Sequence, residues 1–429
     1  MLKAPFDPSP RSYARYVTPV RRAMRGPSAA PRATSFQQTA DWLLREAAAI
    51  GDILELFEEF VWRINASGLP LHRASTHVGT LHPQLTGFAW NWEHADGFVD
   101  EVIVARESRL TDSFRRNPLG RVVDHGETIR VRVSDPAEAA RFPLMQDLAA
   151  QGITDYLARP IGGGAARGVY NAATMATKRE GGFPDAAYRD LMHIFDLFAL
   201  HAERHIAEMI SRNVLDTYLG ASAGRQVLEG AIARGDGRRI EAIVWVSDLR
   251  DFSTLTNRLP AEDMTRLLNA YFEALAGSVM EAGGEVLKFI GDGMLAVFPI
   301  GEDGGRSAAE TALAAAVTAA NRLDGLGAGP TSDLPEAALP LRSGTALHLG
   351  EVFFGNVGAA NRLDFTVIGK AVNEAARVEA MTKPLGANIL VTGQAKALMQ
   401  GDFRDRGLHE LKGADRPLRL FEPVSAAWP

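Results

Sequence analysis

The sequence predicts two domains: an α+β domain with an antiparallel sheet, followed by an α/β domain with one mixed sheet flanked by helices. Three observations support this fold class. The chain has 429 residues, more than a single domain usually holds. Its hydrophobic content of 46% is enough for sizeable cores. Strand patterns lie between two helical patterns in the first half, whereas strands and helices alternate in the second half.

Composition and charge exclude several classes of protein. The net charge of −6 argues against non-specific binding to nucleic acid or to an anionic membrane. No apolar run reaches about 18 residues, so no membrane span is predicted. The N-terminus has no apolar signal segment, and we expect a cytoplasmic protein. The absence of cysteine excludes disulfides, thiolate metal sites and iron–sulfur clusters.

The first half begins with a segment of unusual composition. Residues 1–35 are rich in Pro, Arg, Ser and Ala, which predicts a flexible basic arm, with a partner-docking segment as the alternative. Residues 36–212 then carry the pattern of an α+β domain. Its expected elements are a helix over 39–64, strands over 85–94, 98–105, 153–161 and 168–178, and a long amphipathic helix over 183–210.

Three stretches of this half resemble a GAF sensor domain: "NPLGRVVDHGETIRV", "DYLARPI" and "GGFPDAAYRDL". A related PAS-like sensor is the alternative. The resemblance implies that 36–212 binds a small-molecule ligand, whose identity the sequence does not give. We expect a pocket lined by Trp90, Trp92 and Phe98. A haem or metal site is the alternative, built on His72, His77, His82 and His94.

A linker helix over 213–239 leads to the second domain, over 240–429. Gly235 and Gly237, among charged neighbours, indicate the boundary. Alternating strand and helix patterns then predict the mixed sheet. The expected strands are 242–246, a pair within 285–298, 342–357, 363–369 and 388–392, and the helices are 261–281, 306–323 and 371–381; a Gly/Pro-rich loop covers 325–340.

Two acids stand where strands end in this domain. Asp248 follows an apolar strand in "IVWVSDLRDFS". Asp292 lies between two glycines in "LKFIGDGMLAVF", at the tip of a tight hairpin. Two carboxylates held rigidly on neighbouring strands can share two divalent ions, and their hard oxygens suit Mg²⁺ or Mn²⁺. Aspartates that only form turns are the alternative.

A third segment, "LDFTVIGKAVNEAAR", places two polar side chains on one helix face. Asn373 and Arg377 are four residues apart, so both project from the same side of the expected helix. An amide and a guanidinium on one face can bind a ribose oxygen and a phosphate together. Ordinary helix-surface residues are the alternative.

The three segments, in this order and at these separations, resemble a class III nucleotide cyclase homology domain. The resemblance implies an adenylate cyclase that converts ATP to 3′,5′-cyclic AMP and pyrophosphate. It implies that Asp248, Asp292 and the carbonyl of Leu249 hold two Mg²⁺ or Mn²⁺ ions. In relatives the remaining positions have these roles: Asn373 orients the ribose, Arg377 stabilises charge at the α-phosphate, Lys412 contacts the polyphosphate, and Phe252 contacts the substrate.

Base choice depends on Lys288 and Thr366, which match the family's purine-reading positions. Lys288 offers only donors and can pair with adenine N1, whereas guanine presents a donor there. Thr366 discriminates poorly, because a hydroxyl both donates and accepts. We expect ATP as the substrate. A guanylate or dual-specificity cyclase and a non-catalytic nucleotide-binding regulator remain alternatives, and bicarbonate responsiveness occurs in the subgroup with threonine at this position.

The resemblance also implies a homodimer. One subunit supplies the metal aspartates and the other supplies Lys288, Thr366, Asn373 and Arg377, so each site needs two chains. Two positions depart from the family pattern: Asp251 is often glycine, and Lys370 is often acidic. We expect Asp251 to point away from the substrate, toward the free N–H groups at the start of the next helix.

Overall fold

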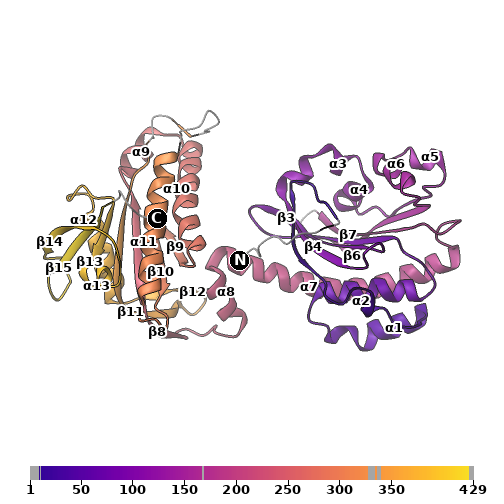
Figure 1. The fold of residues 1–429 in the computed structure, drawn as a ribbon, viewed down its shortest axis with the longest axis horizontal. Coiled ribbons are helices and arrows are strands. Elements are labelled where there is room, and N and C mark those ends of the chain that lie inside the picture. Colours follow the sequence, from indigo (N-terminus) through magenta and orange to yellow (C-terminus); the bar gives the residue numbers. More distant parts are fainter. Residues whose placement is uncertain (1–8, 10, 167–168, 327–333, 336–339, 425–429) are drawn as a thin grey trace. The chain divides into compact units, whose positions relative to one another are not determined.

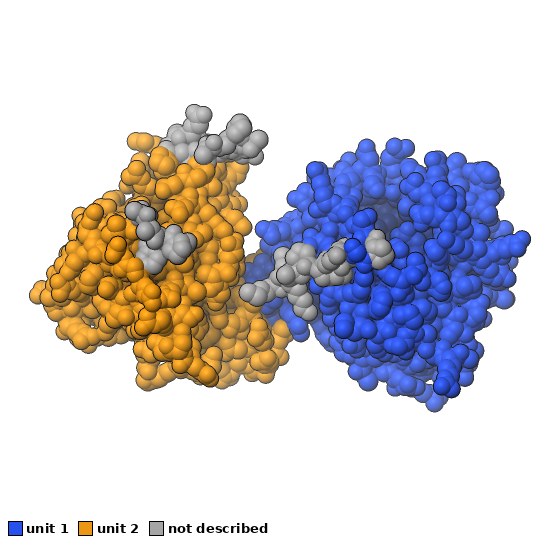
Figure 2. Space-filling view, viewed as in Figure 1, with its two compact units in different colours: residues 1–217 blue, residues 218–429 orange. Residues whose placement is uncertain are grey.

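The computed structural model describes residues 9, 11–166, 169–326, 334–335 and 340–424. The chain divides into two compact units, residues 1–217 and 218–429, and each is built on its own sheet (Figure 2). The predicted fold class, two α/β units with different sheets, is confirmed. Among the described residues, none of the helices combines the length and the apolar character needed to cross a membrane.

The sheet of the first unit has seven strands in the order β1-β4-β3-β2-β7-β6-β5. Every neighbouring pair is antiparallel, as the pattern predicts. The strands are β1 (Val17–Arg22), β2 (Arg73–Gly79), β3 (Leu85–Glu93), β4 (Val99–Ala105), β5 (Ile129–Val131), β6 (Asp155–Ala166) and β7 (Val169–Thr177).

Helices cover both faces of this sheet. The helices α1 (Phe36–Arg45), α2 (Ile53–Ala66) and α7 (Asp185–Leu219) pack on one face, where Phe60 stacks on Phe198 with ring centroids 4.3 Å apart. The other face carries α3 (Asp112–Arg115), α4 (Pro118–His125), α5 (Pro136–Ala139) and α6 (Pro143–Ala150) (Figure 1). Because strand side chains alternate between faces, β6 and β7 contribute to both cores.

Trp90, Trp92 and Phe98 do not form the expected pocket. Trp90 and Trp92 are completely buried in the core that faces α2, and Trp62 packs edge-on against Trp92. Large aromatic side chains on the inner face of a strand fill a core before they line a cavity. The four histidines do not assemble a metal site either, since no group of three or more His, Asp or Glu side chains in the described ranges has metal-binding geometry.

The N-terminal segment also differs from the expected flexible arm. Residues 17–22 form β1, which pairs with β4 at the sheet edge. Arg22 binds the buried carboxylate of Asp100 with an Nε–Oδ1 distance of 2.6 Å, and Arg11 contacts the same carboxylate. Three of the arginines that indicated a solvated arm, Arg11, Arg21 and Arg22, are therefore partners of acids on β4, information that composition alone does not contain. Residues 1–8 and 10 lie outside the described residues.

The second unit has eight strands in the order β14-β15-β13-β11-β8-β10-β9, with β12 paired to β11. Only the β11–β13 pair is parallel among the pairs described, so the sheet is mixed, as predicted. The strands are β8 (Gly237–Leu249), β9 (Glu285–Ile290), β10 (Gly293–Pro299), β11 (Ser343–Ala359), β12 (Arg362–Ile368), β13 (Ile389–Thr392), β14 (Phe403–His409) and β15 (Leu418–Pro423).

Two helical layers enclose this sheet. Ile243 and Trp245 of β8 face α10 (Ala261–Glu281) and α11 (Arg306–Gly325), whereas Ala242 and Val244 face α8 (Ala221–Leu228) and α12 (Lys370–Met381). Short helices α9 (Phe252–Arg258) and α13 (Gly393–Lys396) follow β8 and β13. Because successive side chains of β8 face opposite sides, this central strand is buried between two cores. The two cores fix the position of the strand end.

The predicted linker of 213–239 is divided in the structure. The unit boundary at 217/218 falls in the last turn of α7. Ala223 of α8 is buried against the second unit's sheet, next to Val244. Most of the predicted loop at 325–340 lies outside the described residues.

Candidate active site

The end of β8 positions the first acid. β8 lies between β10 and β11, and Asp248 pairs in register with Gly344 of β11. The next side chain, Leu249, is buried in the core, so it anchors the strand end. The N–H of Leu249 donates to the Asp248 carboxylate. The carboxylate is therefore held on a rigid strand, as predicted.

The second acid comes from the hairpin that joins β9 to β10. Gly291 has a positive φ of 64°, which permits the tight turn that carries Asp292. A Cβ on Gly293 would lie 3.3 Å from Oδ1 of Asp248, so the glycine lets the two segments approach closely. Asp248 and Asp292 share a side-chain hydrogen bond. Burial, followed by the charge of Asp292, raises the pKa of Asp248 to about 6.

A third carboxylate lies in the same electrostatic environment. Burial and the charge of Asp248 raise the pKa of Glu379 on α12 to about 7. The guanidinium of the neighbouring Arg250 donates a hydrogen bond to the backbone carbonyl of Ala387, at 2.8 Å. A divalent cation would relieve the repulsion between Asp248 and Asp292, and hard carboxylate oxygens are the ligands that Mg²⁺ and Mn²⁺ prefer. The residues present therefore fit a cation at this position.

Asp251 does not cap the next helix with its side chain, contrary to the expectation. Its φ of 60° lies in the left-handed region. Among the described residues, it is the only non-glycine residue with a positive φ. Its side chain makes no cap hydrogen bond to α9; instead its backbone carbonyl accepts from Thr254 and Leu255. The carboxylate lies 3.4 Å from Nζ of Lys383. The left-handed backbone explains why glycine suits this position.

The two predicted purine-reading residues lie on β9 and β12, which an ion pair connects. Lys288 of β9 lies 3.5 Å from the carboxylate of Asp364 on β12. Thr366, two residues further along β12, is 3% exposed, and its hydroxyl has no hydrogen-bond partner in the described part of the chain. A buried hydroxyl without a partner is uncommon, and a bound ligand is one way to satisfy it.

Asn373 and Arg377 lie on the exposed side of α12, one turn apart, as predicted. Ala371, Ala375 and Val378 on the opposite side fix the helix against the sheet. In the described ranges, neither Asn373 nor Arg377 makes a side-chain hydrogen bond or ion pair, although exposed arginines elsewhere in this unit do. Both polar groups are therefore free to bind a ligand.

The remaining predicted residues lie apart from these groups. Lys412 is exposed in the turn between β14 and β15. Phe252 is half-buried at the start of α9 and packs against the core around Leu249. No hydrogen bond or ion pair within the described residues joins the aspartates to Lys288, Thr366, Asn373 or Arg377. Sequence reasoning did not identify Glu379, because only the fold brings it near Asp248.

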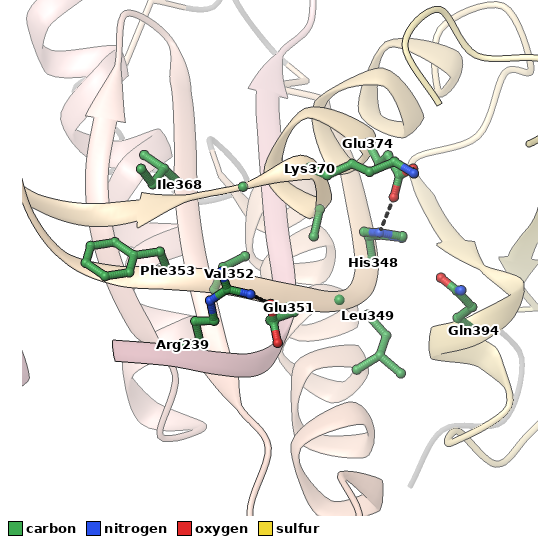
Figure 3. Close-up of a pocket in the computed structure, with 13 residues that line it drawn as sticks. Arg239, His348, Leu349, Glu351, Val352, Phe353, Ile368, Lys370, Glu374 and Gln394 are labelled. Atoms are coloured by element: carbon green, nitrogen blue, oxygen red, sulfur yellow. Dashed lines mark hydrogen bonds and ion pairs between the residues drawn. The ribbon is translucent and has the colours of Figure 1, made fainter. Parts of the chain in front are cut away.

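A cavity of about 550 Å³ lies elsewhere in this unit, between β11 and the start of α12 (Figure 3). His348, buried on β11, lies 3.1 Å from the carboxylate of Glu374, and Lys370 contacts Glu374 and Asp415. At the opposite wall, Arg239 lies 3.0 Å from Glu351 (Figure 3). These charged groups pair with one another. The contact between His348 and Glu374 fixes α12, the helix that carries Asn373. Lys370, unusual for the family, is thus balanced by two acids.

The second unit is similar to known proteins. Residues 238–421 match the family model described as the adenylate and guanylate cyclase catalytic domain. An uncharacterized protein of Mycobacterium tuberculosis is 32% identical over 254 residues, which cover 57% of this chain and 40% of that protein. An adenylate cyclase of Anabaena cylindrica is 36% identical over 146 residues, covering 34% of this chain and 28% of that protein.

A solved structure of a bacterial light-regulated adenylyl cyclase is 30% identical, with a TM-score of 0.39; the match covers 44% of this chain and 92% of that one. The chain spans 40% or less of the curated relatives described above. The family match coincides with the unit that holds the paired aspartates and the exposed Asn–Arg face. Residues 238–421 are therefore similar to the catalytic domain of the adenylate and guanylate cyclases.

Proposed function

We propose that this protein is an adenylate cyclase that converts ATP to 3′,5′-cyclic AMP and pyrophosphate in a homodimer. The observation that carries the proposal is the division of the polar groups into two sets. The paired aspartates concentrate negative charge at one place, while Asn373 and Arg377 are exposed and unpaired at another. Two copies, each offering one set to the other, would complete two equivalent sites.

The reaction joins the 3′-oxygen of the ribose to the α-phosphorus, breaks the bond from that phosphorus to the bridging oxygen, and releases the 3′-hydroxyl proton. Asp248, Asp292 and the carbonyl of Leu249 would hold two Mg²⁺ or Mn²⁺ ions, which lower the pKa of the hydroxyl and neutralise the triphosphate. Asn373 of the other chain orients the ribose, and Arg377 donates to the α-phosphate oxygens. Lys412 binds the polyphosphate, and Phe252 borders the substrate.

ATP is favoured over GTP by the purine-reading residues. Lys288 presents only donors, and its contact with Asp364 holds the ammonium near Thr366. The unpartnered hydroxyl of Thr366 is available to accept from the 6-amino group of adenine. A guanylate cyclase is the second candidate, because the same hydroxyl can donate to guanine O6.

The decisive experiment is a complementation test. Asp292→Asn and Arg377→Ala are purified separately and after co-expression, then assayed with Mn²⁺ and either ATP or GTP. Each variant alone should be inactive. Random pairing makes about half of the dimers mixed, each with one intact site, so about a quarter of the wild-type activity should return. No recovery in verified mixed dimers contradicts the shared site, and product from GTP alone contradicts the base assignment.

We also propose that the first unit is a sensor, GAF-like in its fold, that binds a small molecule and regulates the cyclase through α7. The support is its antiparallel sheet between helices and the continuous helix that leads out of it to the unit boundary. Deleting residues 1–225 should change dimerisation or basal activity. Unchanged dimerisation and turnover in the truncated protein would contradict this role.

A further inference from the structure

A half-buried arginine on β2 has no partner. Arg73 lies on a central strand of the first unit's sheet, between β3 and β7. Within the described residues, its guanidinium makes no hydrogen bond or ion pair, not even with Glu93, its register partner on β3. Arg130 of β5, in contrast, binds Asp155 at 2.7 Å. Arginines that are partly buried are normally paired, so the free guanidinium of Arg73 needs an explanation.

Polar groups project from the same face of β2 as Arg73. Because strand side chains alternate, Ser75 and His77 lie on its side of the sheet. The hydroxyl of Ser75 is hydrogen-bonded to Nε2 of His77 at 2.8 Å and to the hydroxyl of Thr174 on β7 at 2.7 Å. Ser75 and Thr174 are buried, whereas His77 is half-buried. This face therefore places two hydroxyls and an imidazole on the strands that carry the free guanidinium and its neighbours.

Two parts of the first unit border this face. On the β7 side, Ala172 and Ala176 are buried in the core under α4 and α6. On the β3 side, Arg11 of the N-terminal segment donates to the carbonyl of Asn91 at 2.8 Å. The part of the face that stays accessible lies between these borders, over β2, where Arg73 is only half-buried.

The charge of Arg73 acts on the groups around it. Burial first, and then the charge of Arg73, lowers the pKa of His77 to about 4, so this imidazole is neutral at pH 7. Burial raises the pKa of Tyr156 on β6 to about 12, and the charge of Arg73 opposes that rise. Arg73 therefore supplies positive charge to this face, while His77 and Tyr156 supply uncharged polar groups.

We propose that Arg73 anchors a binding site for a small monocarboxylate. A guanidinium binds a carboxylate through two parallel hydrogen bonds, and the hydroxyls of Ser75 and Thr174 can rotate to donate to the same anion. One guanidinium neutralises one negative charge, so a carboxylate is favoured over a phosphate dianion, whose second charge would lack a partner. The inference rests on the proposed sensor role of the first unit and deepens it, because it names the class of ligand.

The first test measures ligand binding to the full chain by saturation-transfer NMR. The probes are propionate and benzoate, with propionamide as the uncharged analogue and inorganic phosphate as the dianion. The wild type should bind the two carboxylates and not propionamide. Arg73→Gln should bind them at least about 10-fold more weakly, because a charge-assisted pair is lost. Arg132→Gln removes the same charge at an exposed position of the same unit and should bind like the wild type.

Thermal unfolding separates a binding role from a role in the fold. An arginine without a partner in the ligand-free protein contributes no pairing energy, so Arg73→Gln should unfold at the wild-type temperature or above it. Arg130→Gln loses the contact with Asp155 and should unfold at a lower temperature. Normal unfolding of Arg73→Gln shows that its weaker binding is not caused by misfolding.

Four results would overturn the proposal: no saturation transfer to either carboxylate in the wild type, equal binding by Arg73→Gln, tighter binding of phosphate than of the carboxylates, or a stability loss in Arg73→Gln like that of Arg130→Gln. Cyclic nucleotide formation with and without propionate tests the sensor role separately. If propionate binds through Arg73 and turnover is unchanged, the site stands and the proposed regulation is wrong. If deleting residues 1–225 changes turnover and no carboxylate binds, the inference about Arg73 alone is wrong.

Discussion

Asp248 at the end of β8 lies within hydrogen-bonding reach of Asp292 in the β9–β10 turn, and burial, followed by the charge of Asp292 and this contact, raises the pKa of Asp248 to about 6. Two carboxylates so close cannot both ionise easily without a cation. Below about pH 6 the cation-free protein therefore holds a proton at this pair, where the metal-loaded protein would hold positive charge. Cation binding and proton release are expected to be linked at this pair.

Asp292→Asn should abolish cyclic nucleotide formation, with a loss of at least about 10²-fold in kcat. The variant removes one of the charges that would bind the cation. It also removes the repulsion between Asp248 and Asp292, so the unfolding temperature in EDTA should not fall. Product formation and thermal unfolding check the two expectations. Activity within a few-fold of wild type at saturating Mn²⁺ would contradict a role for Asp292 in cation binding.

Asp251→Gly should retain activity and raise stability. The left-handed backbone at Asp251 strains a side chain by about 1 kcal/mol, although aspartate tolerates it better than most residues. The exposed contact with Lys383 offsets little of this strain. A higher unfolding temperature with unchanged kcat is the expected result. Asp251→Ala, which keeps the strain and removes the carboxylate, is the control and should not stabilise.

Base selectivity should change when the Lys288–Asp364 pair is altered. Lys288→Glu alone would place two acids together, so the informative variant combines Lys288→Glu with Asp364→Asn. Its kcat/KM for ATP should fall about 10-fold or more relative to GTP, because the donor for adenine N1 has become an acceptor. Asp364→Asn alone is the control. An unchanged ATP/GTP ratio in the double variant would show that Lys288 does not read the base.

Glu379 should make the cation-free protein less stable as pH rises. Its pKa is raised from 4.5 to about 7, so the folded state binds this proton more tightly than the unfolded chain. The favourable contribution is present below about pH 4.5 and is lost as pH rises toward 7. In EDTA, the unfolding temperature of Glu379→Gln should fall less over this range than that of the wild type. Equal slopes would contradict the prediction; Asp248 leaves a residual slope in both proteins.

The first unit should depend on its N-terminal segment. Asp100 is completely buried, and Arg11, Arg22 and Tyr13 supply its partners. Replacing both arginines with alanine leaves a buried carboxylate without a cation, at a cost of about 3–5 kcal/mol. Thermal unfolding of the first unit should shift down sharply. Arg15→Ala, at an exposed position nearby, is the control and should have no effect.

The site was predicted more completely than its surroundings. Asp248, Asp292, Asn373 and Arg377 could be placed on a strand end, a hairpin tip and one helix face because these features depend on local spacing. Trp90 and Trp92 could not be placed, because the sheet face that each occupies depends on strand pairing. Glu379 was not identified, since its significance comes from a neighbour that is distant in sequence.

The sequence by itself determined most elements of the second unit, its resemblance to a cyclase catalytic domain and the chemistry of its acidic and basic side chains. Periodicity, turn glycines and charge are local properties, so they can be read without the fold. Only the tertiary structure decided that Asp251 lies in the left-handed region, that Arg22 neutralises Asp100, and that Glu379 shares the electrostatic environment of Asp248. These depend on backbone angles and on burial among distant segments, which exist only once the chain has packed.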